Sequence, residues 1–275
     1  MKELELLAIE IRKKLLQTIV KAGGGHTGGS LSTVDILVAL YFDVLNIDPG
    51  NPEKKGRDRF IMSKGHSVES YHAVLSRRGF FNEEVLDSYG DFNSILAGHP
   101  TRKVPGVEVN SGALGHGLSV GVGLALAAKR SGGGYRTFVL MGDGEHGEGS
   151  IMEAAAAAGH YKLDNLVAII DRNRLQISGM TEDVMSIENL EAKYEACGWS
   201  VRSCNGHDID ELRANLRETP FEKGKPSFLI AHTVKGKGVS FMEDKAAWHH
   251  KVPSKEELLK AMEELNLKLE NKAHE

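Results

Sequence analysis

The chain has 275 residues, of which 41% are hydrophobic and 26% are charged, a composition typical of a globular protein with an ample core. Its formal net charge of −4 gives no electrostatic reason to expect a nucleic-acid partner. The sequence has no apolar run long enough to span a membrane, no secretory signal and only two cysteines, so we expect a cytoplasmic protein with no membrane partner and no disulfide framework.

The first half of the chain shows mainly helical patterns. Apolar residues at helical spacing predict a helix over 3–22, which ends at Gly23-Gly24-Gly25. Ser32 and Asp35 have the spacing of a capping box, which predicts that the next helix begins at Ser32 and runs to about residue 44. The pattern then predicts a strand over 58–62, a helix over 67–78, an irregular segment over 82–110 and a closely packed helix over 115–130.

The second half alternates strand and helix patterns. Strands are predicted over 136–141, 165–170, 199–204 and 226–233, with helices over 150–159, 187–197 and 208–217. Asp208 and Ser254 stand at N-cap positions, and a last amphipathic helix follows Ser254. This alternation predicts an α/β fold with a mainly parallel sheet and helices on both faces, and we expect one domain over residues 1–275.

Polar residues follow two of these strands at the point where each strand ends. Gly142-Asp143-Gly144 closes one apolar run, and Asp171-Arg172-Asn173 closes the next. Ligands of parallel sheets bind beyond the carboxyl ends of the strands. A carboxylate and an amide oxygen at this edge could hold Mg²⁺ together with phosphate oxygens. The pair therefore predicts a metal–diphosphate site.

A dinucleotide site is an alternative interpretation of the same glycines. Gly142, Gly144 and Gly147 match the spacing of the dinucleotide fingerprint, although this pattern is common. The acids Asp143, Glu145 and Glu148 would crowd a bare pyrophosphate unless a cation lay between them. Binding of a nicotinamide cofactor without metal would favour this alternative.

A set of motifs occurs in one order along nearly the whole chain. Residues 142–173 resemble the thiamine-diphosphate motif, in which Gly-Asp-Gly is followed after a spacer by Asn. Arg172-Asn173 stands where many members have two Asn residues, and the metal-binding Asn is kept. The chain further resembles the transketolase family in the motifs over 21–29, 58–66, 98–100, 106–117, 159–166 and 235–238 and in Trp248-His249.

The resemblance implies the thiamine-diphosphate-binding fold and a cofactor site for thiamine diphosphate. It implies that Mg²⁺, or Ca²⁺ or Mn²⁺ in its place, is held by Asp143, Asn173 and the carbonyl of Leu175. Gly144 would contact the diphosphate, and the residues against the cofactor rings would be Gly112, Leu114 and Ile177. His66 and His249 would bind on the diphosphate side and near the reacting carbon.

The resemblance also implies the reaction, which is transfer of a two-carbon ketol unit from a ketose to an aldose, in many cases as phosphates. His26 and His99 would hydrogen-bond the sugar hydroxyls, and the hydroxyl protons would move through histidines, which suit neutral pH. Glu148 would belong to a carboxylate network that reaches a partner subunit. We interpret five other histidines as structural, whereas His116 and His250 neighbour site positions and stay undecided. The five are His72, His146, His160, His207 and His232.

Transketolases are normally more than twice as long as this chain, and the resemblance covers only their diphosphate-binding domain. We therefore expect the amino-terminal subunit of a split transketolase, with the pyrimidine domain on a separate chain in an α₂β₂ assembly. The helix containing Ala154–Ala158 and the segment 115–128 are candidate packing surfaces. The identity of the sugars stays open, including whether they are phosphorylated or sulfonated, with xylulose 5-phosphate as the default donor.

Two other functions stay open at this point. One is another thiamine enzyme, such as deoxyxylulose-phosphate synthase or a 2-oxoacid dehydrogenase component, although His26, His99 and His249 favour ketose chemistry. The other is a non-catalytic subunit that keeps the fold in order to bind or regulate a partner. Intact Asp143 and Asn173 argue against such a loss of activity.

Overall fold

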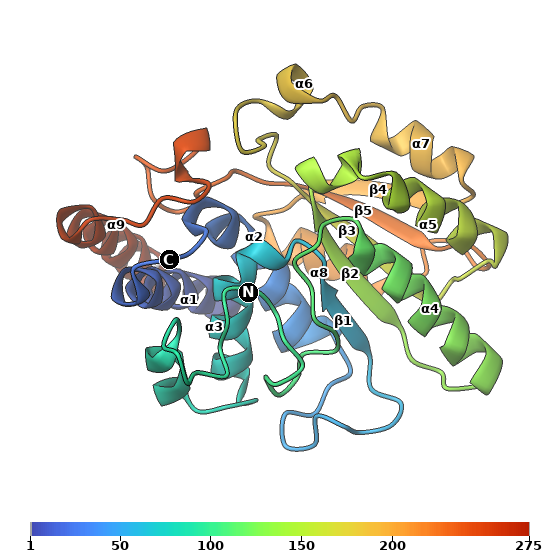
Figure 1. The fold of residues 1–275 in the computed structure, drawn as a ribbon, viewed down its shortest axis with the longest axis horizontal. Coiled ribbons are helices and arrows are strands. Elements are labelled where there is room, and N and C mark those ends of the chain that lie inside the picture. The colour runs from blue at the N-terminus through green and yellow to red at the C-terminus, as the bar shows by residue number, and fades with distance from the viewer. Residues whose placement is uncertain (1, 275) are drawn as a thin grey trace.

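The computed structural model describes residues 2–274, and a parallel sheet lies at the centre of the fold (Figure 1). Within that range the sheet has five strands: β1 (Arg59–Met62), β2 (Thr137–Gly142), β3 (Leu166–Arg172), β4 (Ser200–Asn205) and β5 (Ser227–His232). They lie in the order β1-β2-β3-β5-β4, and every neighbouring pair is parallel. All carboxyl ends therefore lie at one edge of the sheet, and the predicted fold class is confirmed.

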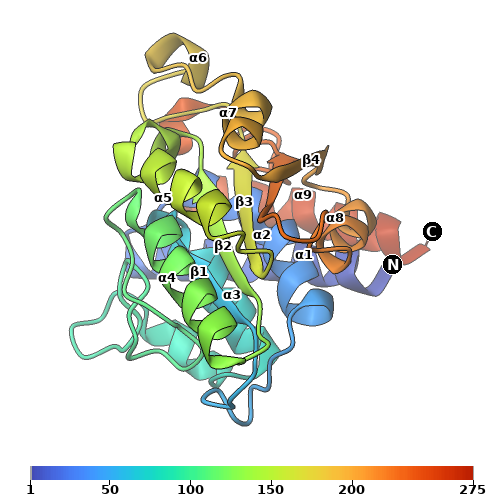
Figure 2. The same cartoon turned by 90° about the vertical axis from the view of Figure 1, so that its right-hand side faces the viewer.

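Helices cover both faces of this sheet (Figures 1 and 2). Phe138 and Leu140 of β2 belong to one apolar core, whereas Val139 and Met141 belong to the other, because successive strand side chains point to opposite faces. The first core contains α1 (Lys2–Ala22), α2 (Thr27–Ala39), α3 (Val68–Arg78), α8 (Ile209–Arg217) and α9 (Lys255–His274). The second contains α4 (His116–Ser131), α5 (Gly149–His160) and α7 (Leu190–Ala196). None of the described helices is both long enough and apolar enough to cross a bilayer.

The predicted start of the second helix is wrong. α2 begins at Thr27 and ends at Ala39, where a π-helical turn over Leu40–Val44 follows. Ser32 and Asp35 lie inside α2 and are buried. Their hydrogen-bond partners come from elements that are distant in the sequence. The Ser32 hydroxyl donates to Asp171, and Asp35 accepts from the guanidinium of Arg12. Each residue therefore makes a tertiary contact and neither caps a helix, so their capping-box spacing is a coincidence.

The other predicted elements lie within a few residues of their expected bounds. Both predicted N-caps are confirmed: Asp208 Oδ1 accepts from the main-chain N–H of Glu211 at 3.0 Å, and Ser254 Oγ accepts from that of Glu257 at 3.1 Å. Several short elements were not predicted: α6 (Thr181–Val184) and 3₁₀ turns over Gly65–Ser67, Glu83–Ser88, Gly144–Gly147 and Ala246–Trp248. The turn over Glu83–Ser88 lies inside the segment expected to be irregular.

His72 in α3 makes the stability of the fold sensitive to acid. It is 1% exposed, and neither ring nitrogen has a hydrogen-bond partner among the described residues. Burial lowers the pKa of His72 to about 3. The unfolded chain takes up this proton near pH 6.5 and the folded chain only near pH 3, so His72 destabilises the fold progressively as the pH falls between these values.

We expect His72→Leu to remove this loss. When the pH is lowered from 7 to 5, the difference in free energy of unfolding between the variant and wild type should shift by about 2 kcal/mol in favour of the variant. The reason is that the unfolded variant no longer gains that proton. Urea titrations of both proteins at the two pH values measure the difference. The exposed His160, replaced by Leu, is the control and should show no such change. A difference that stays constant with pH would contradict the expectation.

Candidate functional site

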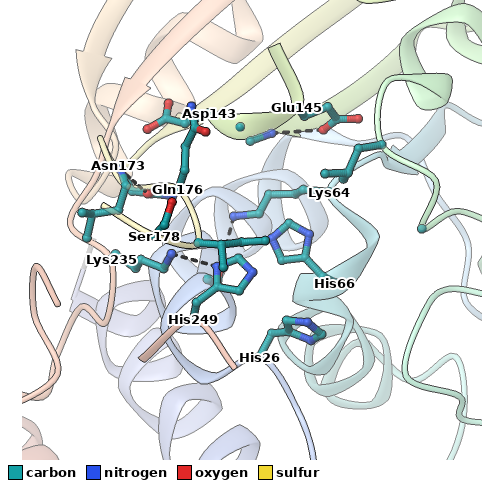
Figure 3. Close-up of a pocket in the computed structure, with 17 residues that line it drawn as sticks. His26, Lys64, His66, Asp143, Glu145, Asn173, Gln176, Ser178, Lys235 and His249 are labelled. Carbon is teal, nitrogen blue, oxygen red and sulfur yellow. Dashed lines mark hydrogen bonds between the residues drawn. The ribbon is translucent and has the colours of Figure 1, made fainter. Parts of the chain in front are cut away.

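A cavity of about 430 Å³ opens at the carboxyl edge of the sheet (Figure 3). Its walls come from the segments that follow β1, β2, β3 and β5 and from the start of α2. Most of the predicted site residues line it together: His26, His66, Gly112, Leu114, Asp143, Gly144, Asn173, Leu175, Ile177 and His249. The volume falls within the range of roughly 300–1,000 Å³ that is typical of small-molecule sites.

Asp143 lies where β2 ends, and Gly142 pairs in register with Asp171 of β3, so the two strand ends adjoin. The residue is 2% exposed. Its Oδ2 accepts from Arg172 Nη1 at 3.1 Å and from the Thr181 hydroxyl at 3.3 Å, whereas its buried Oδ1 has no partner within residues 2–274. Burial raises the pKa of Asp143 to about 6, against the opposing effect of Arg172.

A cation fits this unpartnered oxygen, since a buried carboxylate oxygen without a hydrogen bond is unfavourable. Asn173 lies in the same loop, where its Oδ1 accepts from the main-chain N–H of Leu175 at 3.1 Å. Among the described residues, no group of three or more His, Cys, Asp or Glu side chains could hold a metal. A cation at Asp143 would therefore need amide, carbonyl and ligand oxygens as well, which is how Mg²⁺ binds beside phosphates.

Arg172 connects Asp143 to a surface segment. Its guanidinium also contacts Glu182 at 2.8 Å and Glu188 at 2.7 Å, and the side chain is 4% exposed. The Arg that departs from the family pattern therefore neutralises the buried aspartate from one side. Oδ1 is then the oxygen of Asp143 that has no hydrogen-bond partner among the described residues.

Two buried lysines line the cavity, and sequence reasoning assigned neither of them a role. Lys64 and Lys235 are 1% and 2% exposed. Lys235 Nζ lies 2.9 Å from His249 Nδ1, and burial together with the charge of Lys64 lowers the pKa of Lys235 to about 8. Two buried ammonium groups beside a cavity fit a polyanion such as a diphosphate. Both lysines lie within sequence motifs, over 58–66 and 235–238, and this position could have indicated that they belong to the site.

Asp171 joins the elements beneath the cavity. It is fully buried and accepts from Lys64, from the hydroxyls of Ser32 and Thr233, and from Asn173 Nδ2 at 3.3 Å. Burial opposes ionisation, but Lys64 and the hydroxyl donors outweigh it and lower the pKa of Asp171. The Asp171 carboxylate of β3 thus binds α2, the loop after β1 and the end of β5 through hydrogen bonds and an ion pair.

Glu145 was also missed as a residue that lines the cavity. It is 1% exposed and accepts from the Ser63 hydroxyl, from Gly115 N–H at 3.0 Å and from Gly142 N–H at 3.2 Å, while burial raises its pKa. Glu148 is exposed at the start of α5 and does not line the cavity. Of the three acids predicted to crowd a diphosphate, Asp143 is the one with an unpartnered oxygen in the cavity.

Histidines form a cluster over the cavity, centred on His26. The centroid of the His26 ring lies 5.3 Å from that of His66, 5.6 Å from His249, 6.2 Å from His99 and 4.5 Å from His250. The ring nitrogens of His26, His66, His99 and His250 make no hydrogen bond within residues 2–274. They are therefore available to a ligand.

The inner histidines are neutral at pH 7. Burial, followed by the nearby imidazole of His250, lowers the pKa of His26 to about 4. Burial and Lys235 lower the pKa of His249 to about 3, and burial lowers that of His66. A neutral imidazole can both accept and donate a hydrogen bond, so these rings can hydrogen-bond the hydroxyl groups of a ligand.

His99 lies at the rim and not in the cavity wall. It is exposed, and Gly112 packs so closely against it that a Cβ on Gly112 would come within 2.7 Å of its Cδ2. Of the histidines interpreted as structural, His146 bonds to the carbonyl of Gly142 at 2.9 Å and His207 contacts Asp35 at 2.7 Å. His116 is exposed beside the site, with its Nδ1 3.1 Å from the carbonyl of Leu114.

Known proteins are similar to this chain in sequence and in structure. The family model described as "Transketolase, thiamine diphosphate binding domain" matches residues 5–272. An apulose-4-phosphate transketolase subunit from Phocaeicola vulgatus is 54% identical over 97% of this chain and 95% of the relative. A 6-deoxy-6-sulfo-D-fructose transketolase subunit from a Clostridium species is 42% identical, over 90% of each chain.

A solved transketolase from Campylobacter jejuni superposes with a TM-score of 0.91 at 33% identity, over 97% of this chain and 43% of that one. The chain thus spans less than half of that solved transketolase and nearly all of the two subunit relatives. The matched region includes both strand ends and every residue of the cavity. The chain belongs to the transketolase family, in which it corresponds to the thiamine-diphosphate-binding domain.

Proposed function

We propose that the chain is the cofactor-binding subunit of a two-chain transketolase, which transfers a two-carbon ketol unit from a ketose phosphate to an aldose phosphate. One observation carries the proposal: a single cavity brings together an unpartnered buried carboxylate oxygen, two buried ammonium groups and neutral histidines. The agreement in length with relatives named as subunits supports the two-chain form.

The cofactor would be thiamine diphosphate with Mg²⁺. Asp143, Asn173 and the Leu175 carbonyl would hold the metal, and the diphosphate would meet Gly144, Lys64, Lys235, His66 and His249. Gly112, Leu114 and Ile177 would lie against its rings. When bound, thiamine diphosphate supplies the electron sink that allows the bond beside a sugar carbonyl to break.

The chain's own residues would hold the sugar hydroxyls. His26, His66 and His249 stay neutral at pH 7, so each can accept or donate a hydrogen bond to a sugar hydroxyl. Lys64 and Asp143 are almost fully buried, which limits the access of water to both side chains. His99 would hold the sugar from the rim.

The partner would be a pyrimidine-domain chain in an α₂β₂ assembly. α4 and α5 pack side by side, and several of their exposed positions are small or apolar, namely Val120, Gly123, Ala127 and Ala156. Small residues allow a partner's backbone to approach closely. Glu148 is exposed at the start of α5, where a carboxylate could reach such a partner.

We further propose apulose 4-phosphate as the donor. Two relatives named for this sugar are 54% and 49% identical to the chain, whereas the relative named for a sulfosugar is 42% identical. Assays with apulose 4-phosphate, 6-deoxy-6-sulfofructose and xylulose 5-phosphate as donors test this choice. The highest kcat/KM for another donor would overturn the substrate and leave the reaction class intact.

Reconstitution tests the whole proposal. We expect no ketol transfer by this chain alone and full turnover once the pyrimidine-domain chain, thiamine diphosphate and Mg²⁺ are added, because the chain supplies only part of the site. Native mass spectrometry should then show two copies of each chain with bound cofactor. Turnover by the chain alone, or a complex that binds no thiamine diphosphate, would contradict the proposal and favour a non-catalytic role.

A further inference from the structure

His250 stands out because the proposed function leaves it without a role. Among the four rings around His26, that of His250 lies nearest, at 4.5 Å between centroids and with an interplanar angle of 70°. It follows directly after His249, which lines the cavity, but does not line the cavity itself. It is exposed, and no hydrogen bond engages its ring nitrogens within residues 2–274.

The histidine cluster has an inner and an outer level. His26, His66 and His249 line the cavity that also contains Asp143, whereas His99 and His250 are exposed on the solvent side of His26. Figure 3 shows His26 below His66 and His249, at the end of the cluster farther from Asp143. A molecule that reaches the cavity past His26 therefore passes His250 on its way.

The backbone of His250 is held in place from both sides. His249 Nδ1 lies 2.9 Å from Lys235 Nζ, and the carbonyl of Lys251 accepts from the Thr27 hydroxyl at 2.6 Å. The Lys251 ammonium also lies 4.1 Å from the centroid of the Trp248 ring. Because its neighbours in the chain are held, the backbone that carries the His250 imidazole loses little conformational entropy when a ligand binds.

We propose that His250 is a substrate-binding residue at the mouth of the cavity, where its imidazole hydrogen-bonds polar groups of the sugar that lie away from the reacting carbonyl. This inference rests on the proposed function, because it assumes a polyhydroxylated sugar phosphate with its carbonyl at the inner level. The imidazole suits either a hydroxyl or a phosphate oxygen, since each ring nitrogen can donate or accept according to tautomer.

The simplest alternative is that His250 only packs against His26. Two substitutions separate the two roles. His250→Phe keeps an aromatic ring for His26 and removes hydrogen bonding, whereas His250→Gln keeps hydrogen bonding and removes the ring. His160→Phe is the matched control, because His160 is exposed at the far end of α5, about 18 Å along that helix from the carboxyl edge of the sheet.

The reconstituted two-chain complex is assayed for KM, kcat and the Kd of thiamine diphosphate. We expect His250→Phe to raise the donor or acceptor KM about tenfold, the effect of one lost hydrogen bond, with kcat and the cofactor Kd unchanged. His250→Gln should keep KM within about threefold of wild type. A wild-type KM for the Phe variant, equal losses in the Phe and Gln variants, or a parallel loss of cofactor affinity would each overturn the proposal.

Failure of the proposed function gives a different result. A wild-type complex that binds thiamine diphosphate but transfers no ketol unit would refute that function without reference to His250. In that case, calorimetry of an unreactive sugar-alcohol phosphate binding to the same complexes tests whether His250 contacts the sugar. Weaker binding by the Phe variant alone supports the substrate contact, and equal binding by wild type and both variants overturns it.

Discussion

Replacing Asp143 by alanine is expected to abolish Mg²⁺-dependent binding of thiamine diphosphate and to leave the fold intact. The carboxylate is the one acid in the cavity whose buried oxygen has no partner among the described residues, so its removal takes away the charged ligand that we propose for the metal. Loss of one charged ligand should weaken cofactor affinity by at least about 100-fold, since mutation of residues that only hydrogen-bond to metal ligands already lowers metal affinity roughly 10–100-fold. Titration of thiamine diphosphate with and without Mg²⁺ measures the effect.

The fold should tolerate this change because Arg172 keeps two other carboxylate partners. Glu182 and Glu188 lie 2.8 Å and 2.7 Å from its guanidinium, so the buried charge is not orphaned when Asp143 is lost. Circular dichroism and the urea midpoint check this point. Asp91→Ala, at an exposed loop position, is the control. Equal cofactor affinity in wild type and Asp143→Ala would remove the metal assignment.

The sheet could be predicted from the sequence because its signal is local. Each central strand is a short apolar run that ends in a polar or glycine turn, and the runs alternate with helical patterns. The same locality revealed the two strand ends that carry Asp143 and Asn173. A parallel sheet brings such ends to one edge whatever the details of packing.

The errors arise where tertiary contacts decide the structure. Every residue of α2 is buried, so the helix has no polar face and no cap that would mark its start. Lys64 and Lys235 were missed because lysine is rarely buried without a partner, and the partners, Asp171 and His249, come from other segments. The short 3₁₀ turns are likewise set by packing and not by periodicity.

Asp171→Asn is expected to destabilise the fold by about 3–5 kcal/mol, because it leaves the Lys64 ammonium buried without a compensating charge. The amide also cannot accept from all four donors that now converge on the carboxylate. Urea unfolding of the cofactor-free chain at pH 7 measures the free energy. The loss should be smaller at low pH, because the pKa of Asp171 is lowered and its stabilising effect fades as the pH falls below about 4.

The double variant Asp171→Asn with Lys64→Met separates the charge from the hydrogen bonds. Removing both members of a buried ion pair is often far less costly than removing one, so the second substitution should restore part of the lost stability. The stability so recovered measures how much of the cost comes from the unpaired ammonium. If the double variant were less stable than Asp171→Asn by the full effect of Lys64→Met alone, the two residues would be energetically independent. The ion pair would then not be what holds α2 and the loop after β1 to the sheet beneath the cofactor site.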